Sequence, residues 1–77
     1  MSKDVTIYTS YGSGQCTITK MWLQERDVQY RERKLHQPNV RKELALLGFE
    51  TTPVVIVDDT AIIGFNPTEL SAALELE

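Results

Sequence analysis

The sequence predicts one α/β domain, in which a mixed four-stranded sheet carries helices on its faces. Alternating β-branched stretches and helical stretches follow one another in the order β-α-β-α-β-β-α. The chain has 77 residues and contains no linker, internal repeat or low-complexity segment that would separate two domains. We therefore expect residues 1–77 to form a single domain with a small core.

The first strand and the first helix are predicted within the first third of the chain. Residues 5–9 alternate and are β-branched, which predicts a strand, and residues 10–14 contain two glycines, which predicts a turn. From about residue 15 to residue 26 the apolar spacing is helical and forms two neighbouring stripes. The stripes are Ile18, Met21 and Trp22, and beside them Cys16, Thr19 and Leu23.

A second strand and a second helix follow. Residues 28–35 alternate and carry many charges, which is typical of an edge strand, and the first three elements then form a βαβ unit. Pro38 suits the first turn of the next helix, and Gly48 suits the position just after its end. Its buried face is expected to consist of Val40, Leu44 and Leu47.

The last third of the chain predicts a β-hairpin and a helix. Residues 54–57 and 60–63 are the strands of the hairpin, with two aspartates in its tight turn. The final helix begins with Asn66 as N-cap, Pro67 as first helical residue and Glu69 as the partner in a capping box. Its apolar face is expected to consist of Leu70, Ala73 and Leu74.

Composition and charge argue against several classes of function. The 8 basic residues are outnumbered by 11 acidic ones, and the net charge of −3 does not suit a nucleic-acid surface. One cysteine allows no internal disulfide and too few ligands for a Cys/His zinc site, so no metal is expected. No apolar run would span a bilayer, and the start of the sequence lacks a signal peptide's apolar region. We expect a monomeric cytoplasmic protein that binds neither membrane nor nucleic acid.

Three short blocks of sequence carry the information about function. Residues 13–20 read Ser-Gly-Gln-Cys-Thr-Ile-Thr-Lys, residues 53–55 read Pro-Val-Val, and residues 64–67 read Gly-Phe-Asn-Pro. The first block follows a strand and opens a helix, where unpaired N–H groups and the helix dipole favour a thiolate over a thiol. At this spacing the three blocks resemble the small glutaredoxins, and especially the NrdH-type redoxins. The resemblance implies a thioredoxin (glutaredoxin-like) fold over nearly the whole chain.

Two positions depart from the pattern of these redoxins. Ser13 stands where the family has the first cysteine of its Cys-x-x-Cys motif, and Ile62-Ile63 replaces a common Trp-Ser. Ser13 is either an introduced Cys→Ser change, which would give an inactive or trapped form, or a natural variant without dithiol activity. A serine–histidine hydrolase is not expected, because nothing in the sequence links His36 to a relay.

The resemblance implies a small thiol–disulfide oxidoreductase that donates electrons to a protein disulfide, with ribonucleotide reductase as the recipient. Ser13 would hold the position of the attacking cysteine and Cys16 would be the sheltered resolving cysteine, with Gly14 and Gln15 shaping the gap. Pro53 would follow a cis peptide bond and leave the backbone free to pair with an incoming chain. The substrate-binding residues so implied are Tyr11, Thr52, Pro53, Gly64 and Phe65.

Two alternatives stay open at this point. The electron source is either thioredoxin reductase or glutathione, and thioredoxin reductase is favoured because residues 64–67 lack the Gly-Gly-x-Asp pattern that contacts glutathione. The rival to an enzyme is a non-catalytic thioredoxin-fold binding module that docks a partner beside Pro53. No resident cofactor is expected in either case. A solvated basic face that acidic partners could use is expected at Arg31, Arg33, Lys34, Arg41 and Lys42.

Overall fold

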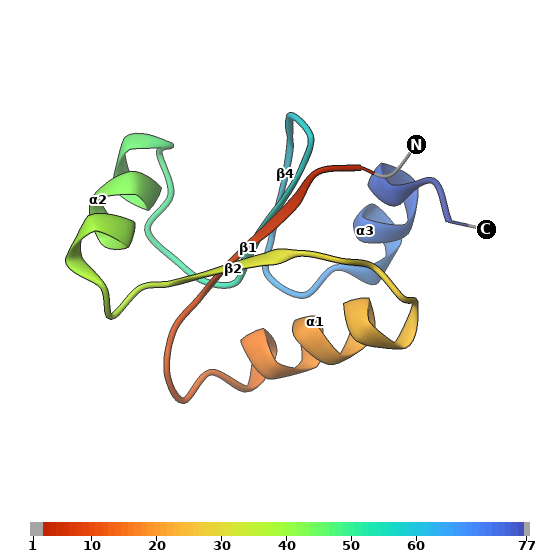
Figure 1. The fold of residues 1–77 in the computed structure, drawn as a ribbon, viewed down its shortest axis with the longest axis horizontal. Coiled ribbons are helices and arrows are strands. Elements are labelled where there is room, and N and C mark those ends of the chain that lie inside the picture. Colours follow the sequence, from red (N-terminus) through yellow and green to blue (C-terminus); the bar gives the residue numbers. More distant parts are fainter. Residues whose placement is uncertain (1–2, 77) are drawn as a thin grey trace.

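The chain forms two strand–helix pairs, a hairpin and a last helix, in the predicted order (Figure 1). The computed structural model describes residues 3–76, so Met1, Ser2 and Glu77 of the predicted domain lie outside the described residues. The elements are β1 (Val5–Thr9), α1 (Gly14–Glu25), β2 (Arg31–Lys34), α2 (Pro38–Leu46), β3 (Val54–Val57), β4 (Thr60–Ile63) and α3 (Pro67–Leu74).

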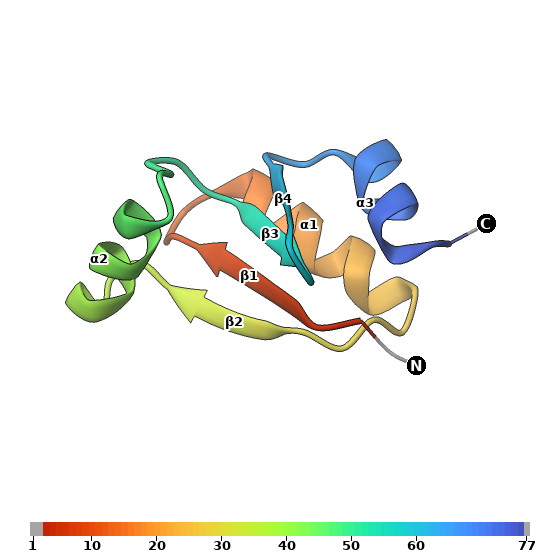
Figure 2. The ribbon, with the colours of Figure 1, turned by 90° about the horizontal axis from the view of Figure 1, so that it is seen from above.

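The four strands form the predicted mixed sheet, in the order β2-β1-β3-β4 (Figure 2). β1 pairs in parallel with β2 and antiparallel with β3, and β3 pairs antiparallel with β4. The register places Ile7 between Glu32 of β2 and Val55 of β3. Parallel neighbours need a crossover connection, and α1 provides it between β1 and β2. The charged strand β2 lies at one edge of the sheet, as predicted.

Alternate strand residues build two hydrophobic clusters on opposite faces of the sheet. On the face that α1 and α3 cover, Leu23 and Leu70 belong to the cluster that contains Ile7. On the other face, Leu44 of α2 belongs to the cluster that contains Tyr8. Ile7 and Tyr8 are consecutive, so their side chains point in opposite directions. Figures 1 and 2 both show α2 standing apart from α1 and α3.

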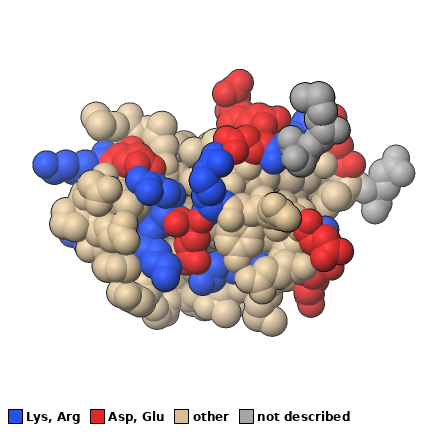
Figure 3. Space-filling view, viewed as in Figure 1, with Lys and Arg blue, Asp and Glu red and all other residues tan. Residues whose placement is uncertain are grey.

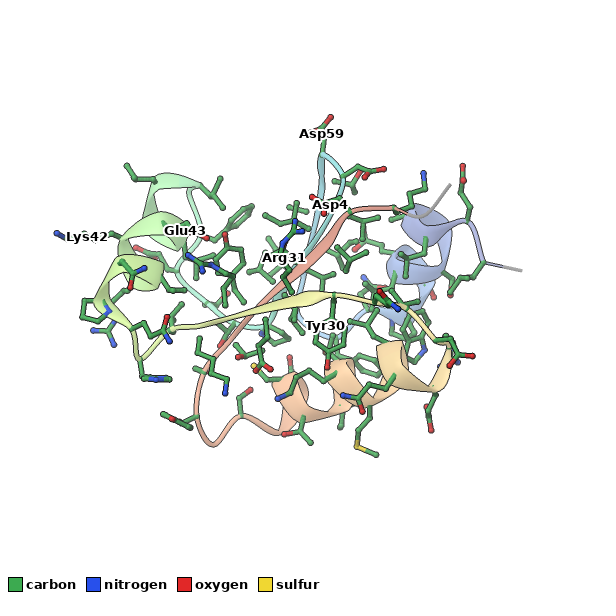
Figure 4. The ribbon with its side chains drawn as sticks, viewed as in Figure 1. Asp4, Tyr30, Arg31, Lys42, Glu43 and Asp59 are labelled. Atoms are coloured by element: carbon green, nitrogen blue, oxygen red, sulfur yellow. The ribbon has the colours of Figure 1, made fainter. Side chains whose placement is uncertain are left out.

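A polar cluster joins α2 to the sheet. The hydroxyl group of Tyr8 on β1 donates a hydrogen bond to the carboxylate of Glu43 on α2. Arg33 on β2 donates to both oxygens of the same carboxylate, at 2.6 and 3.2 Å. Figure 4 labels Glu43 on α2, at the side of the helix nearer the sheet. Burial of the tyrosine, together with its hydrogen bond to Glu43, raises the pKa of Tyr8 to about 12.

The structure shows which of the two predicted stripes of α1 is buried. Ile18 and Met21 are 50% and 53% exposed, so of the first predicted stripe only Trp22 joins the core. The second stripe is buried throughout, including Cys16. A helix that covers one face of a sheet buries a single stripe, and the residues on its far side face water. Of the two predicted stripes, one is therefore buried along its whole length and the other only at Trp22.

The predictions for β2 and α2 also need correction. β2 has four residues instead of the predicted span 28–35, because Val28 and Tyr30 leave the sheet and pack against the core under α1. Leu47 was predicted to be buried but is 48% exposed, since α2 ends before it. Gly48 follows with a φ of +91°, which a glycine adopts without strain, and it ends the helix as predicted.

The start of α3 follows the prediction with one difference. The Asn66 side chain accepts a hydrogen bond from the backbone N–H of Glu69 at 3.1 Å, which confirms Asn66 as the N-cap. In a capping box the Glu69 carboxylate would bond to the backbone N–H of Asn66. It accepts instead from the side-chain amide of Asn66, at 2.7 Å.

Candidate active site

The functional motif opens α1, and Ser13 is the N-cap of this helix. The Ser13 hydroxyl oxygen accepts a hydrogen bond from the backbone N–H of Cys16 at 3.2 Å. The Ser13 carbonyl oxygen accepts from the backbone N–H of Thr17, also at 3.2 Å. Ser13 is half-buried, whereas Cys16 is only 2% exposed and carries a free thiol. The structure therefore confirms the low exposure predicted for Cys16 and joins the two motif positions by a hydrogen bond.

The second and third sequence blocks lie together beside the first. The Thr52–Pro53 peptide bond is cis, as the resemblance implies. The backbone N–H of Gly64 donates to the Pro53 carbonyl oxygen at 2.8 Å. Gly64 has a φ of +75°, and a Cβ atom there would lie 3.6 Å from the side-chain oxygen of Gln15. The fold thus brings three segments of the chain together around the start of α1.

Two further contacts anchor this side of the motif. The hydroxyl groups of Ser10 and Thr52 are hydrogen-bonded at 2.7 Å, which holds the segment before the motif against the segment before Pro53. Phe65 is partly buried and packs against the core under α1 and α3. Thr52, Pro53, Gly64 and Phe65 therefore lie on the β3–β4 side of the motif, and their role in substrate binding stays a prediction.

A cavity of about 390 Å³ opens on the β2 side of the motif. Ser13, Gly14 and Cys16 line it from α1, and Glu32 and Lys34 line it from β2. Of the predicted substrate-binding residues, only Tyr11 contributes to its lining. The motif thus separates two regions: the cavity and the segments around Pro53 and Gly64.

A carboxylate with two hydrogen-bond donors lies in the wall of this cavity. Glu32 accepts from the hydroxyl of the buried Thr9 at 2.7 Å and from the ammonium group of Lys20 at 3.1 Å. Burial by itself would raise the pKa of Glu32, but these two hydrogen bonds and the charges of Lys20 and Lys34 lower it below its usual value. Glu32 therefore stays ionised near neutral pH and is held in place.

An aromatic pair forms part of the cavity rim. The rings of Tyr11 and His36 are stacked, with centroids 4.8 Å apart and an angle of 25° between the planes. Tyr11 is 78% exposed, so a flat aromatic surface faces solvent beside Ser13. A partner for His36 was not predictable from sequence, because α1 and β2 separate it from Tyr11 along the chain.

Several residues of the cavity were missed by the sequence reasoning. Lys20 belongs to the recognised motif but received no role, and Lys34 was expected only to be part of a solvated face. Glu32 and Lys34 are two residues apart on β2, so their side chains lie on the same face of the sheet. The two-residue spacing of Glu32 and Lys34 could have indicated a shared site, but only if β2 was known to lie beside β1.

The described residues form neither a metal-binding cluster nor a membrane-spanning helix. Within residues 3–76, no three His, Cys, Asp or Glu side chains are grouped as a metal site would need. No helix in the same part of the chain combines the length and the apolar character of a membrane span.

The sheet order, the helix-start motif and the cis proline beside it define a redoxin with a thioredoxin-like fold. The sequence matches the glutaredoxin family over residues 5–62, and the chain belongs to this family. It is 35% identical to the glutaredoxin-like protein NrdH of Lactococcus lactis subsp. cremoris over 68 residues, which cover 87% of this chain and 94% of that protein. The same values hold for NrdH of Lactococcus lactis subsp. lactis.

Solved structures support the same assignment. The glutaredoxin-like NrdH-redoxin of Escherichia coli superposes with a TM-score of 0.81 at 30% identity, over 90% of this chain and 92% of that one. The glutaredoxin of Methanosarcina mazei superposes with a TM-score of 0.80 over 92% of this chain and 77% of that one. At 22% identity the latter supports the fold alone. The chain is thus a glutaredoxin and NrdH-like redoxin, from a family of thiol–disulfide oxidoreductases.

Proposed function

We propose that this chain is an NrdH-type electron donor to a protein disulfide whose turnover requires a cysteine at position 13. With Ser13 it binds the same partner but does not complete the exchange, because an alcohol is not appreciably ionised near neutral pH. One observation carries the proposal: the Ser13 hydroxyl oxygen accepts the backbone N–H of Cys16 at the start of α1. A sulfur atom in that position would receive the same N–H and the positive end of the helix dipole, which favour a thiolate.

The exchange proceeds in two steps and transfers two electrons. A thiolate at position 13 attacks one sulfur of the partner's disulfide, which forms a mixed disulfide and releases the partner's other sulfur as a thiolate. The Cys16 thiol then loses its proton and attacks the sulfur at position 13, which releases the partner as a dithiol. The two positions are now joined by a disulfide, and an external reductant restores them. No resident cofactor is required, since the thiol pair carries the electrons.

Ribonucleotide reductase is proposed as the recipient and the cytoplasm as the location, on the basis of the resemblance to NrdH. The structure of the E. coli relative is described as explaining the thioredoxin-like activity profile of a glutaredoxin-like protein. We therefore propose thioredoxin reductase, and not glutathione, as the source of electrons. The missing Gly-Gly-x-Asp pattern at residues 64–67 supports the same choice.

Restoring the sulfur at position 13 tests the proposal. We expect Ser13→Cys to reduce the disulfides of insulin with NADPH and thioredoxin reductase, and to be slow with glutathione and glutathione reductase. The unchanged chain and Ser13→Ala are the controls, and both should be inactive. Ser13→Cys combined with Cys16→Ser should accumulate a mixed disulfide that mass spectrometry detects.

The same experiment separates the enzyme from its rival. No turnover of Ser13→Cys with either reductant would contradict the proposed activity. Binding of an oxidised partner without turnover would then favour the non-catalytic module. Turnover with glutathione alone would keep the enzyme and replace its electron source.

A further inference from the structure

The cavity beside Ser13 carries a surplus of positive charge, although the chain as a whole has a net charge of −3. Lys20 and Lys34 line it together with one carboxylate, that of Glu32. The charge of Glu32 is matched by Lys20, whose ammonium group lies 3.1 Å away. Within residues 3–76, Lys34 forms no ion pair. Two lysine charges in the cavity therefore face a single carboxylate, which leaves one positive charge in excess.

The shape of the cavity leaves room for an anionic group near that lysine. Gly14, the first residue of α1, lines the cavity, and no atom lies within 4 Å of where its Cβ would stand. The space beside the first turn of α1 is therefore open, at the end of the helix whose dipole favours negative charge. The volume of about 390 Å³ is near the lower end of the sizes typical of small-ligand sites, which suits one or two side chains.

We propose that this cavity receives an acidic side chain of the partner polypeptide, an Asp or Glu beside the disulfide that reacts at position 13. The inference rests on the proposed function and names a substrate class for it: protein disulfides flanked by carboxylates. The cavity is lined by Ser13 and Cys16 themselves, so a chain reacting at position 13 brings its neighbouring residues to the cavity. The exposed Tyr11, stacked on His36, offers that chain a flat surface at the rim.

The charge distribution of the surface supports an acidic partner in one orientation. Figure 3 shows Lys and Arg side chains gathered around β2 and α2, with some carboxylates among them, whereas Asp and Glu dominate near the β3–β4 hairpin and at the end of the molecule away from α2. Complementary charges steer an encounter and penalise the wrong orientation more than they add to affinity. An acidic segment would thus be directed to the side of the molecule that carries the cavity.

Disulfide peptides of different charge test the inference. Three synthetic peptides with one internal Cys-Ala-Ala-Cys disulfide are flanked on both sides by Glu, by Gln or by Lys. They are given to the Ser13→Cys variant with thioredoxin reductase. We expect kcat/KM for the Glu peptide to exceed that for the Gln peptide by about threefold to fivefold, the upper range for an exposed ion pair, and the Lys peptide to be slowest. The preference should fall at high salt.

A matched pair of lysine variants locates the effect. Lys34→Gln, made in the Ser13→Cys background, should abolish the preference for the Glu peptide. Lys42→Gln removes the same charge from an exposed position on α2 that does not line the cavity, and it should keep the preference (Figure 4). Equal kcat/KM for the three peptides, or equal losses in both variants, would overturn the inference while leaving the proposed function intact.

Two further measurements complete the test. If Ser13→Cys reduces no peptide, the proposed function fails, and fluorescence anisotropy of labelled peptides on the unchanged chain then tests the cavity alone. Tighter binding of the Glu peptide that depends on Lys34 supports the inference there, and equal binding overturns it. Reduced glutathione is then added at the same concentration as the Glu peptide. If it displaces the peptide and Lys34→Gln prevents this, the occupant is a small-molecule carboxylate and the polypeptide assignment is wrong.

Discussion

Tyr8 shows how one buried hydroxyl group can couple folding to pH. Its ring is 4% exposed in the core under α2, and its hydroxyl donates to the carboxylate of Glu43. A phenolate in this place would be desolvated and would face a carboxylate, so the folded state holds the proton more tightly than the unfolded chain. Hydrogen bonds from Arg33 and Tyr8 lower the pKa of Glu43, so Glu43 remains the acceptor at neutral pH.

The first prediction concerns the loss of stability at alkaline pH. The pKa of Tyr8 is raised from 10.0 to about 12, so its contribution to stability is complete below pH 10 and is lost as the pH rises toward 12. Urea unfolding at several pH values should show this decline in the unchanged chain and a smaller one in Tyr8→Phe. At neutral pH, Tyr8→Phe should cost about 1 kcal/mol for the missing hydrogen bond.

The control for this prediction is a second tyrosine. Tyr11→Phe removes a hydroxyl group that is outside the core, so the alkaline decline should persist in that variant. An equal decline in Tyr8→Phe and the unchanged chain would show that Tyr8 is not its source. A difference spectrum at 295 nm between these proteins should place the titration of Tyr8 near pH 12.

At the scale of elements, the position of a leucine around the α2 axis, and not its hydrophobicity, decides whether it is buried. Leu44 is 1% exposed, whereas Leu46, two residues later, is 89% exposed. Two residues correspond to more than half a turn, so the side chains leave the helix on nearly opposite sides. The face of α2 that meets the sheet is therefore narrow.

The second prediction compares these two leucines. Leu44→Ala should destabilise the fold by about 2–5 kcal/mol, because it removes buried methyl groups and leaves a cavity. Leu46→Ala removes the same atoms from the solvent-exposed side and should change stability by about 0.5 kcal/mol or less. Both free energies come from urea unfolding monitored by circular dichroism. Similar losses in the two variants would contradict the observed orientation of α2.

Sequence patterns predicted the elements well where the signal is local. The order of strands and helices, Asn66 as an N-cap and Gly48 as a helix stop depend on a few neighbouring residues, and the structure confirms all of them. The buried face of α1 was predicted only in part. Periodicity shows which residues share a face of a helix, but the sheet and α3 decide which face is covered. The spacing of Ile18 and Met21 therefore could not show that both face solvent.

At the scale of the whole molecule, the sheet lies between two hydrophobic clusters and contributes side chains to both. One cluster lies under α1 and α3 and the other under α2, and neighbouring residues of β1 contribute to both. If one cluster unfolds, the strands lose the contacts that hold them in place, and the other cluster loses its strand side chains. We therefore expect the two halves of the core to unfold together, as small domains usually do.

The third prediction tests this coupling through one variant in each core. Leu44→Ala and Leu70→Ala should each shift a single cooperative unfolding transition to lower urea concentration. Their side chains belong to different clusters on opposite faces, so the free-energy changes in the double variant should add to within about 0.5 kcal/mol. Two separate transitions, seen by near-ultraviolet and far-ultraviolet circular dichroism, would contradict a single folding unit.

The candidate site was predictable only as far as its motif. The helix-start position of Ser13 and Cys16 follows from adjacent residues, and the resemblance supplied Pro53 and Gly64. The cavity depends on β2 lying parallel to β1, which brings Glu32 to Thr9 and Lys20 across gaps of 23 and 12 residues. No local pattern encodes that contact, so the charge of the cavity becomes visible only in three dimensions.

The hydrogen bond from the backbone of Cys16 to Ser13 has a consequence for any redox-active form of this chain. A serine hydroxyl caps α1 in every redox state, whereas a sulfur atom accepts the N–H well as a thiolate and poorly once it is joined in a disulfide. Oxidation would then loosen the first turn of the helix, and by thermodynamic linkage the capped helix would favour the reduced state. With serine at position 13, the cap of this helix does not change with the redox state of its surroundings.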